Sequence, residues 1–165
     1  MNKTRRAANA ANTLVEVLVA LLLIGIFFAS VFELNAVCLR YIEASKEAVS
    51  AIAAVQDRTE VLRNLAFADL TSSSYVQTLL ATPANGSDLA KRATEVVKLQ
   101  AYPTTNGVRQ FTRSNGTVTV TEPSPAPVLG DNLVQVDVSF TWPATFGQRT
   151  RIEQTTMIVS NGQKK

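Results

Sequence analysis

The sequence contains no histidine and a single cysteine, Cys38. Without histidine, the chain cannot build a Ser-His-Asp or Cys-His catalytic arrangement, an imidazole general base or a histidine-ligated zinc site. A single cysteine can form neither an internal disulfide nor a thiolate metal site. Because no other residue spacing indicates a catalytic centre, we expect no enzymatic activity, no cofactor and no metal.

The net positive charge of the chain equals the charge of its N-terminal basic residues. The chain has 16 basic and 13 acidic residues, a net charge of +3. Lys3, Arg5 and Arg6 equal that excess, so the rest of the chain is formally neutral. A basic surface for a polyanion would need charge spread over the folded part of the protein. We therefore predict no direct nucleic-acid binding.

A long apolar run follows the basic residues. From Thr13 to Phe32 the only charged residue is Glu16. Twenty residues at about 1.5 Å per residue cross a hydrocarbon core of about 30 Å as a helix. The basic flank favours a cytoplasmic N-terminus, which places the bulk of the chain outside. A secretory signal is disfavoured, because no small-x-small cleavage site follows the run.

Helical character continues beyond the apolar run. From Leu34 to about Leu62 the chain has no proline and no glycine, and apolar residues recur at helical spacing. The predicted apolar face comprises Leu34, Val37, Cys38, Tyr41, Ala48, Val49, Ile52 and Val55. The predicted polar face comprises Arg40, Glu43, Lys46, Glu47, Asp57 and Arg58. We expect one helix whose outer half packs on a globular domain and whose inner half packs on neighbouring subunits. The alternative is a membrane anchor that continues into a coiled-coil spacer.

The C-terminal part predicts strands. Residues 67–107 are rich in Ser, Thr, Ala and Asn and contain breakers, so we expect a connector with one short helix from Ser87 to Val97. An Asn-Gly step between 108–113 and 117–122 indicates a hairpin. Strict alternation from Val134 to Trp142 predicts a half-buried strand, and 149–159 is its expected partner. The predicted fold class is α+β: a long N-terminal helix packed by an antiparallel sheet of about four strands.

Glu16 raises the question of its counter-ion. An ionised side chain deep in a bilayer costs about 2.5–3.5 kcal/mol, less near the interface. Its helical neighbours Asn12, Thr13, Val19 and Ala20 carry no charge. A cut after Ala11 would give Asn12 a new ammonium group one turn from Glu16, or opposite Glu16 of a neighbouring subunit. The simpler alternative is that Glu16 sits solvated at the headgroup boundary.

The segment from Ala11 to Leu21, "ANTLVEVLVAL", resembles the N-terminal motif of type IV prepilins and type II secretion pseudopilins. In that family a membrane aspartyl peptidase removes a short basic leader, the new N-terminus is methylated, and the fifth mature residue is glutamate. The resemblance implies that Ala11 ends the leader, Asn12 begins the mature chain and Glu16 is that glutamate. Family members usually have glycine before the cut and phenylalanine after it, where this chain has alanine and asparagine.

The resemblance also implies a role and a segmentation of the chain. The role is that of a minor pilin of V type or a minor pseudopilin of I type, and the expected partners are other pilin or pseudopilin subunits, prepilin peptidase, an assembly platform and the lipid bilayer. We expect it first in the cytoplasmic membrane as a single pass, and then in a filament. The rival is a membrane-tethered periplasmic binding or sensor domain. The expected segments are a leader (1–11), a membrane or filament-core half helix (12–33), an amphipathic stem (34–66), a variable connector (67–107), a sheet (108–160) and a tail (161–165).

Overall fold

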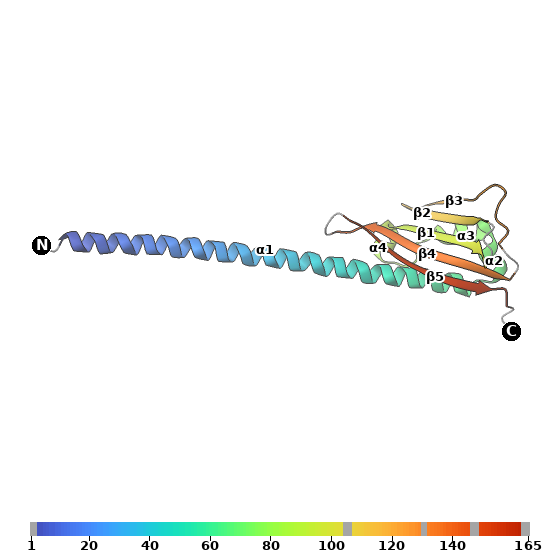
Figure 1. Ribbon diagram of the computed structural model, residues 1–165, viewed down its shortest axis with the longest axis horizontal. Coiled ribbons are helices and arrows are strands. Elements are labelled where there is room, and N and C mark those ends of the chain that lie inside the picture. The colour runs from blue at the N-terminus through green and yellow to red at the C-terminus, as the bar shows by residue number, and fades with distance from the viewer. Residues whose placement is uncertain (1–2, 104–106, 130–131, 146–148, 163–165) are drawn as a thin grey trace. The chain divides into compact units, whose positions relative to one another are not determined.

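In the computed structural model, the chain divides into two compact units, Met1–Glu43 and Ala44–Lys165. The structure describes residues 3–103, 107–129, 132–145 and 149–162, with side chains from Leu14 onward. Figure 1 shows the ribbon of the elements described below.

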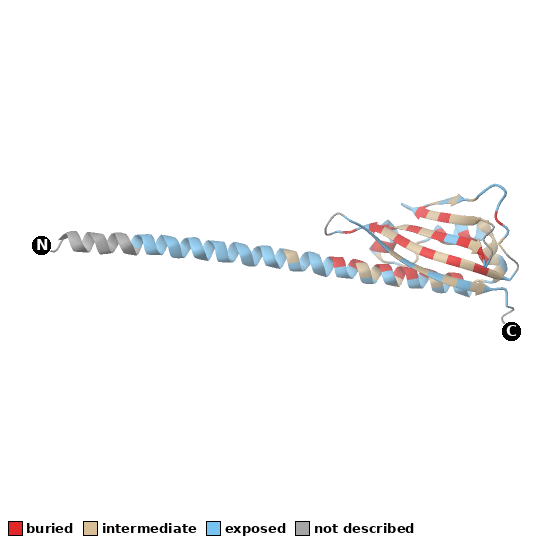
Figure 2. Ribbon diagram, viewed as in Figure 1, coloured by how far each residue is buried: buried red, intermediate tan, exposed pale blue. Residues whose placement is uncertain are grey.

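Helix α1, Lys3–Asn64, is the longest element and supplies the first unit. No proline occurs before Pro83, and Gly25 is the only glycine within the helix, so nothing in the sequence interrupts its hydrogen bonds. From Leu14 to Glu43 every residue except Val37 is exposed, as the blue ribbon of Figure 2 shows. One 18-residue window reaches a mean hydropathy of 2.7, so α1 is long and apolar enough to span a membrane.

The second unit is built on an antiparallel sheet. The described residues form five strands in the order β3-β2-β1-β4-β5. The strands are β1 Thr94–Ala101, β2 Val108–Ser114, β3 Thr117–Thr121, β4 Leu133–Pro143 and β5 Thr150–Ser160. The α+β prediction is confirmed, but the sheet has five strands instead of about four.

The additional strand, β1, lies within the segment expected to be a connector. The same segment contains three short helices, α2 Phe67–Thr71, α3 Ser73–Leu80 and α4 Asp88–Arg92. Ser87 caps α4 as predicted, with its hydroxyl accepting from the Ala90 amide. The prediction that this helix reaches Val97 was wrong, because the β-branched run after Ala93 pairs with β2 and β4.

The predicted hairpin is confirmed. Strands β2 and β3 pair with Ser114 opposite Thr117, which leaves Asn115 and Gly116 as a two-residue turn. Both turn residues have positive φ, 49° and 79°. This is the backbone that a two-residue hairpin favours, and Asn and Gly adopt it most readily.

The core lies between the sheet and the helices of the second unit. Alternate residues of β4, from Val134 to Trp142, are buried as predicted. They pack in one cluster with residues of α1 and of the short helices, so one face of the sheet is covered. Strand β5 pairs with β4 over eleven residues, from Leu133 opposite Ser160 to Pro143 opposite Thr150.

The apolar face predicted for the stem is only partly confirmed in the second unit, where Val55 is buried but other predicted members are not. Val49 and Ile52 are 66% and 43% exposed, whereas Ala51 and Ala54 are fully buried. Small side chains allow the helix to approach the sheet closely, and this outweighs the larger hydrophobicity of valine and isoleucine. The buried face of α1 is Ala44, Glu47, Ala51, Ala54, Val55, Arg58 and Leu62.

Candidate functional site

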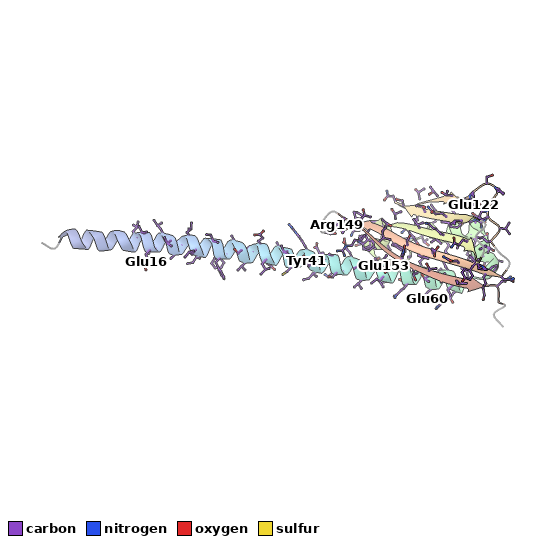
Figure 3. All side chains as sticks on the ribbon, viewed as in Figure 1. Glu16, Tyr41, Glu60, Glu122, Arg149 and Glu153 are labelled. Carbon is purple, nitrogen blue, oxygen red and sulfur yellow. The ribbon has the colours of Figure 1, made fainter. Side chains whose placement is uncertain are left out.

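Glu16 is an exposed carboxylate in an apolar stretch of α1. Its side chain points away from the helix among exposed aliphatic residues (Figure 3). Leu14, Val17 and Val19 next to it are each at least half exposed. Within the part of the chain with described side chains, Glu16 forms no ion pair. An ionised carboxylate in apolar surroundings is usually retained because it has a charged partner. For Glu16, that partner would have to come from another segment of the chain or from another subunit.

The position that would supply this partner lies one helical turn earlier. The backbones of Ala11 and Asn12 belong to α1, while their side chains lie outside the described residues. Residues four apart on a helix lie on the same face, so a charge on the Asn12 nitrogen would be near Glu16. The spacing therefore permits an ion pair that exists only once the chain begins at Asn12.

A second acidic group, Glu47, joins α1 to α4 and to the loop after β4 within the second unit. Glu47 of α1 accepts hydrogen bonds from Arg92 and from the Thr145 hydroxyl, and the Thr145 amide donates to it at 3.2 Å. Burial raises the pKa of Glu47, but the bonds from Thr145 and Arg92 outweigh it and hold the pKa below its ordinary value. Glu47 therefore connects α1 to the loop after β4 through hydrogen bonds to its charged carboxylate.

A buried ionic cluster joins α1 to β1 and β2. Glu95 is fully buried between Arg58 and Arg113, which are 2% and 1% exposed. Arg58 Nε lies 2.5 Å from Glu95 Oε1, and Arg113 Nε lies 3.0 Å from Glu95 Oε2. The guanidinium groups also donate to the backbone carbonyls of Thr82, at 2.7 Å, and Ala90. Buried charges are tolerated when they are paired and their other donors are satisfied, and both conditions hold here.

Comparison with known proteins identifies the N-terminal segment. A family model described as "Prokaryotic N-terminal methylation motif" matches residues 6–32. The chain carries a type IV pilin-like N-terminal motif. No curated protein and no solved structure matches it. The matched range contains Ala11, Asn12 and Glu16 and covers the apolar half of α1.

The matched motif has four implications for the chain. The motif implies a prepilin that is processed by a peptidase. Proteins with this motif are structural and not enzymatic. The motif, together with the apolar helix, indicates membrane anchoring and pilus assembly. It also suggests assembly with other pilin subunits.

The ionic residues that connect α1 to the rest of the second unit were not predicted from the sequence. Glu47 and Arg58 were assigned to the polar face of the stem, and Glu95 and Arg113 were given no role. A signal was present at Glu95, which occupies an inward position of the alternation Glu95, Val97, Leu99. An acid at an inward position indicates a buried basic partner. The sequence alone does not say which arginine that is.

Proposed function

We propose that this chain is a structural subunit of a type IV pilus or type II secretion pseudopilus, a minor pilin or minor pseudopilin. Residues 1–11 form the leader, and prepilin peptidase cuts between Ala11 and Asn12. Glu16 is the assembly residue. The observation that carries the proposal is a lone carboxylate in an apolar helix, inside the matched motif and one turn after the expected cut.

The charge balance explains why processing and assembly are linked. Before the cut, Glu16 has no nearby cation within its own helix. After the cut, the ammonium group of Asn12 supplies one, either in the same helix or from a neighbouring subunit. An ion pair in a low-dielectric environment is stronger than in water, so it favours one axial position of the helix. Methylation of the Asn12 nitrogen belongs to the same proposal.

The location follows from the ends of the apolar run. The basic residues Lys3, Arg5 and Arg6 stay in the cytoplasm, and the unit from Ala44 onward lies outside the cytoplasmic membrane. The assembly platform then moves the processed chain from the bilayer into the filament. Because Glu47 and Arg58 join α1 to the sheet unit, that unit follows the helix during this movement.

The experiment replaces Glu16 and measures the amount of chain in purified filaments. Glu16→Gln and Glu16→Ala should insert into the membrane normally but reduce incorporation by at least about tenfold, equivalent to about 1.4 kcal/mol. Glu60→Gln, which removes an exposed carboxylate in the second unit, is the matched control and should assemble like the wild type. If the Glu16 variants behave like the wild type, the helix is a membrane tether for a binding or sensor domain and the proposal fails.

A further inference from the structure

Three more charged residues of the first unit, Glu33, Arg40 and Glu43, form no hydrogen bond or ion pair with any side chain that the structure describes. After Glu16, the charged residues of α1 up to Glu43 are Glu33, Arg40 and Glu43 itself. Glu33 and Arg40 are exposed, and neither forms a hydrogen bond or ion pair within the described ranges. Unlike the rest of the stretch, these charges gain nothing from lipid or from an apolar neighbour. Neither lipid nor an apolar contact therefore explains why charged residues occur at positions 33 and 40.

The spacing of Glu33 and Arg40 places them on one face of the helix. Seven residues rotate the helix by about 700°, which is about 20° short of two full turns. The rise between them is about 10.5 Å. Charges pair within a helix at three or four residues, so Glu33 and Arg40 are too far apart for a regular pair within the helix.

Glu33 has no basic residue within reach in its own helix. The positions three and four residues away are Ala29, Ser30, Ala36 and Val37. Arg40 has one acidic neighbour at this spacing, Glu43, and the structure shows no bond between them. A cation for Glu33 would therefore have to come from outside its own helix.

We propose that Glu33 of one subunit pairs with Arg40 of a second copy of this chain, whose parallel stem is displaced by about two helical turns. This inference rests on the proposed function, because it requires stems bundled in parallel. A displacement of seven residues brings the opposite charges level and leaves the small and apolar residues Ala36 and Val37 between them on the same face. Charged residues that flank an apolar seam set partner choice and register in parallel helices.

The position of Glu33 strengthens such a pair. Glu33 directly follows the apolar run that ends at Phe32. A carboxylate at this boundary is less screened by salt than one in open solvent. The pair therefore gives register at the outer end of the membrane-length segment, and it implies that at least two copies of the chain are neighbours in the filament.

The test is a charge exchange measured as incorporation into filaments. Glu33→Arg and Arg40→Glu should each reduce incorporation by at least about tenfold, and the double exchange should restore it to within about threefold of the wild type. Glu43→Gln is the matched control, because it removes the only acidic neighbour of Arg40 in its own helix. It should leave incorporation unchanged.

A second measurement detects the contact directly. In a Cys38→Ser background, copies with Glu33→Cys and copies with Arg40→Cys are expressed together and oxidised in the membrane. Disulfide-linked dimers should exceed those from Glu33→Cys expressed with Glu43→Cys. If single exchanges do nothing, or the double exchange is no better than either single one, the pair between copies is refuted.

Failure of this inference is distinguishable from failure of the proposed function. Leader removal and the effect of Glu16→Gln are measured in the same strains. If both remain while the exchange gives no rescue, only the Glu33–Arg40 pair fails. If the wild-type chain is neither processed nor incorporated, the proposed function fails and the pair fails with it.

Discussion

Arg58 of α1 and Glu95 of β1 are 37 residues apart in the sequence and 2.5 Å apart between Nε and Oε1. Neither side chain is more than 3% exposed. Arg113 of β2 holds the second oxygen of the same carboxylate. One buried acid thus joins the stem helix to two strands, and this contact fixes which face of α1 meets the sheet.

Replacing that acid should strongly destabilise the second unit. Glu95→Gln leaves two buried guanidinium groups without their shared carboxylate, and breaking a buried pair costs about 3–5 kcal/mol. Urea unfolding of the full-length protein in detergent micelles measures the change. Glu60→Gln is the control, because its pair with Arg63 is more than half exposed and should contribute at most about 1 kcal/mol. Equal losses in the two variants would contradict the role of Glu95.

Glu47 makes stability depend on pH. Its pKa is lowered in the folded protein, so its contribution is complete above the ordinary glutamate pKa of about 4.3 and is lost as the pH falls through the lower folded value. Unfolding free energies of wild type and Glu47→Gln should therefore differ at neutral pH and converge in acid. Thr145→Val removes one donor and should raise the pKa of Glu47, moving the acid loss to higher pH. A pH-independent difference between wild type and Glu47→Gln would argue against this account.

The turn between β2 and β3 requires positive φ. Gly116 has φ of 79°, where a Cβ costs about 1–2 kcal/mol. Gly116→Ala should lower the unfolding free energy by that amount, although no atom lies within 4 Å of the added Cβ. Asn115→Gly, at φ of 49°, is the control and should change stability by less than about 1 kcal/mol. The same urea experiment serves, and equal effects at both positions would exclude backbone strain as the cause.

The buried face of α1 is testable with neighbouring residues. Ala54 is fully buried under the sheet, so Ala54→Leu should overpack the core and cost about 1–3 kcal/mol. Val49→Ala, on the exposed side, should change stability by less than about 0.5 kcal/mol. Thermal unfolding followed by circular dichroism reports both. If Val49→Ala destabilised the protein more than Ala54→Leu, the packing face of α1 would instead contain Val49 and Ile52.

Local patterns in the sequence predicted much of the fold. The Asn115-Gly116 turn and the alternation of β4 depend on adjacent residues, and both appear in the structure. The uninterrupted α1 follows from the absence of proline before Pro83. In each case, the physical cause acts within a few residues along the chain.

Features that depend on distant contacts were not predictable. Strand β1 was missed because Glu95 takes an inward position of its apolar alternation, where it is accommodated by Arg58 and Arg113. Part of the packing face of α1 was misassigned, because helical spacing placed Val49 and Ile52 on it whereas the smaller Ala51 and Ala54 are buried. The same holds for the candidate functional residues. Glu16 could be identified from its apolar run, whereas the hydrogen bonds of Glu47 depend on Thr145, 98 residues away.

The most direct test of the central claim is the intact mass of the full-length chain expressed with and without a prepilin peptidase. We expect the peptidase to remove the mass of residues 1–11, leaving a chain that begins at Asn12, one turn before Glu16. A chain that keeps residues 1–11 in the presence of an active peptidase, and in recovered filaments, would contradict the claim that processing supplies the partner of Glu16.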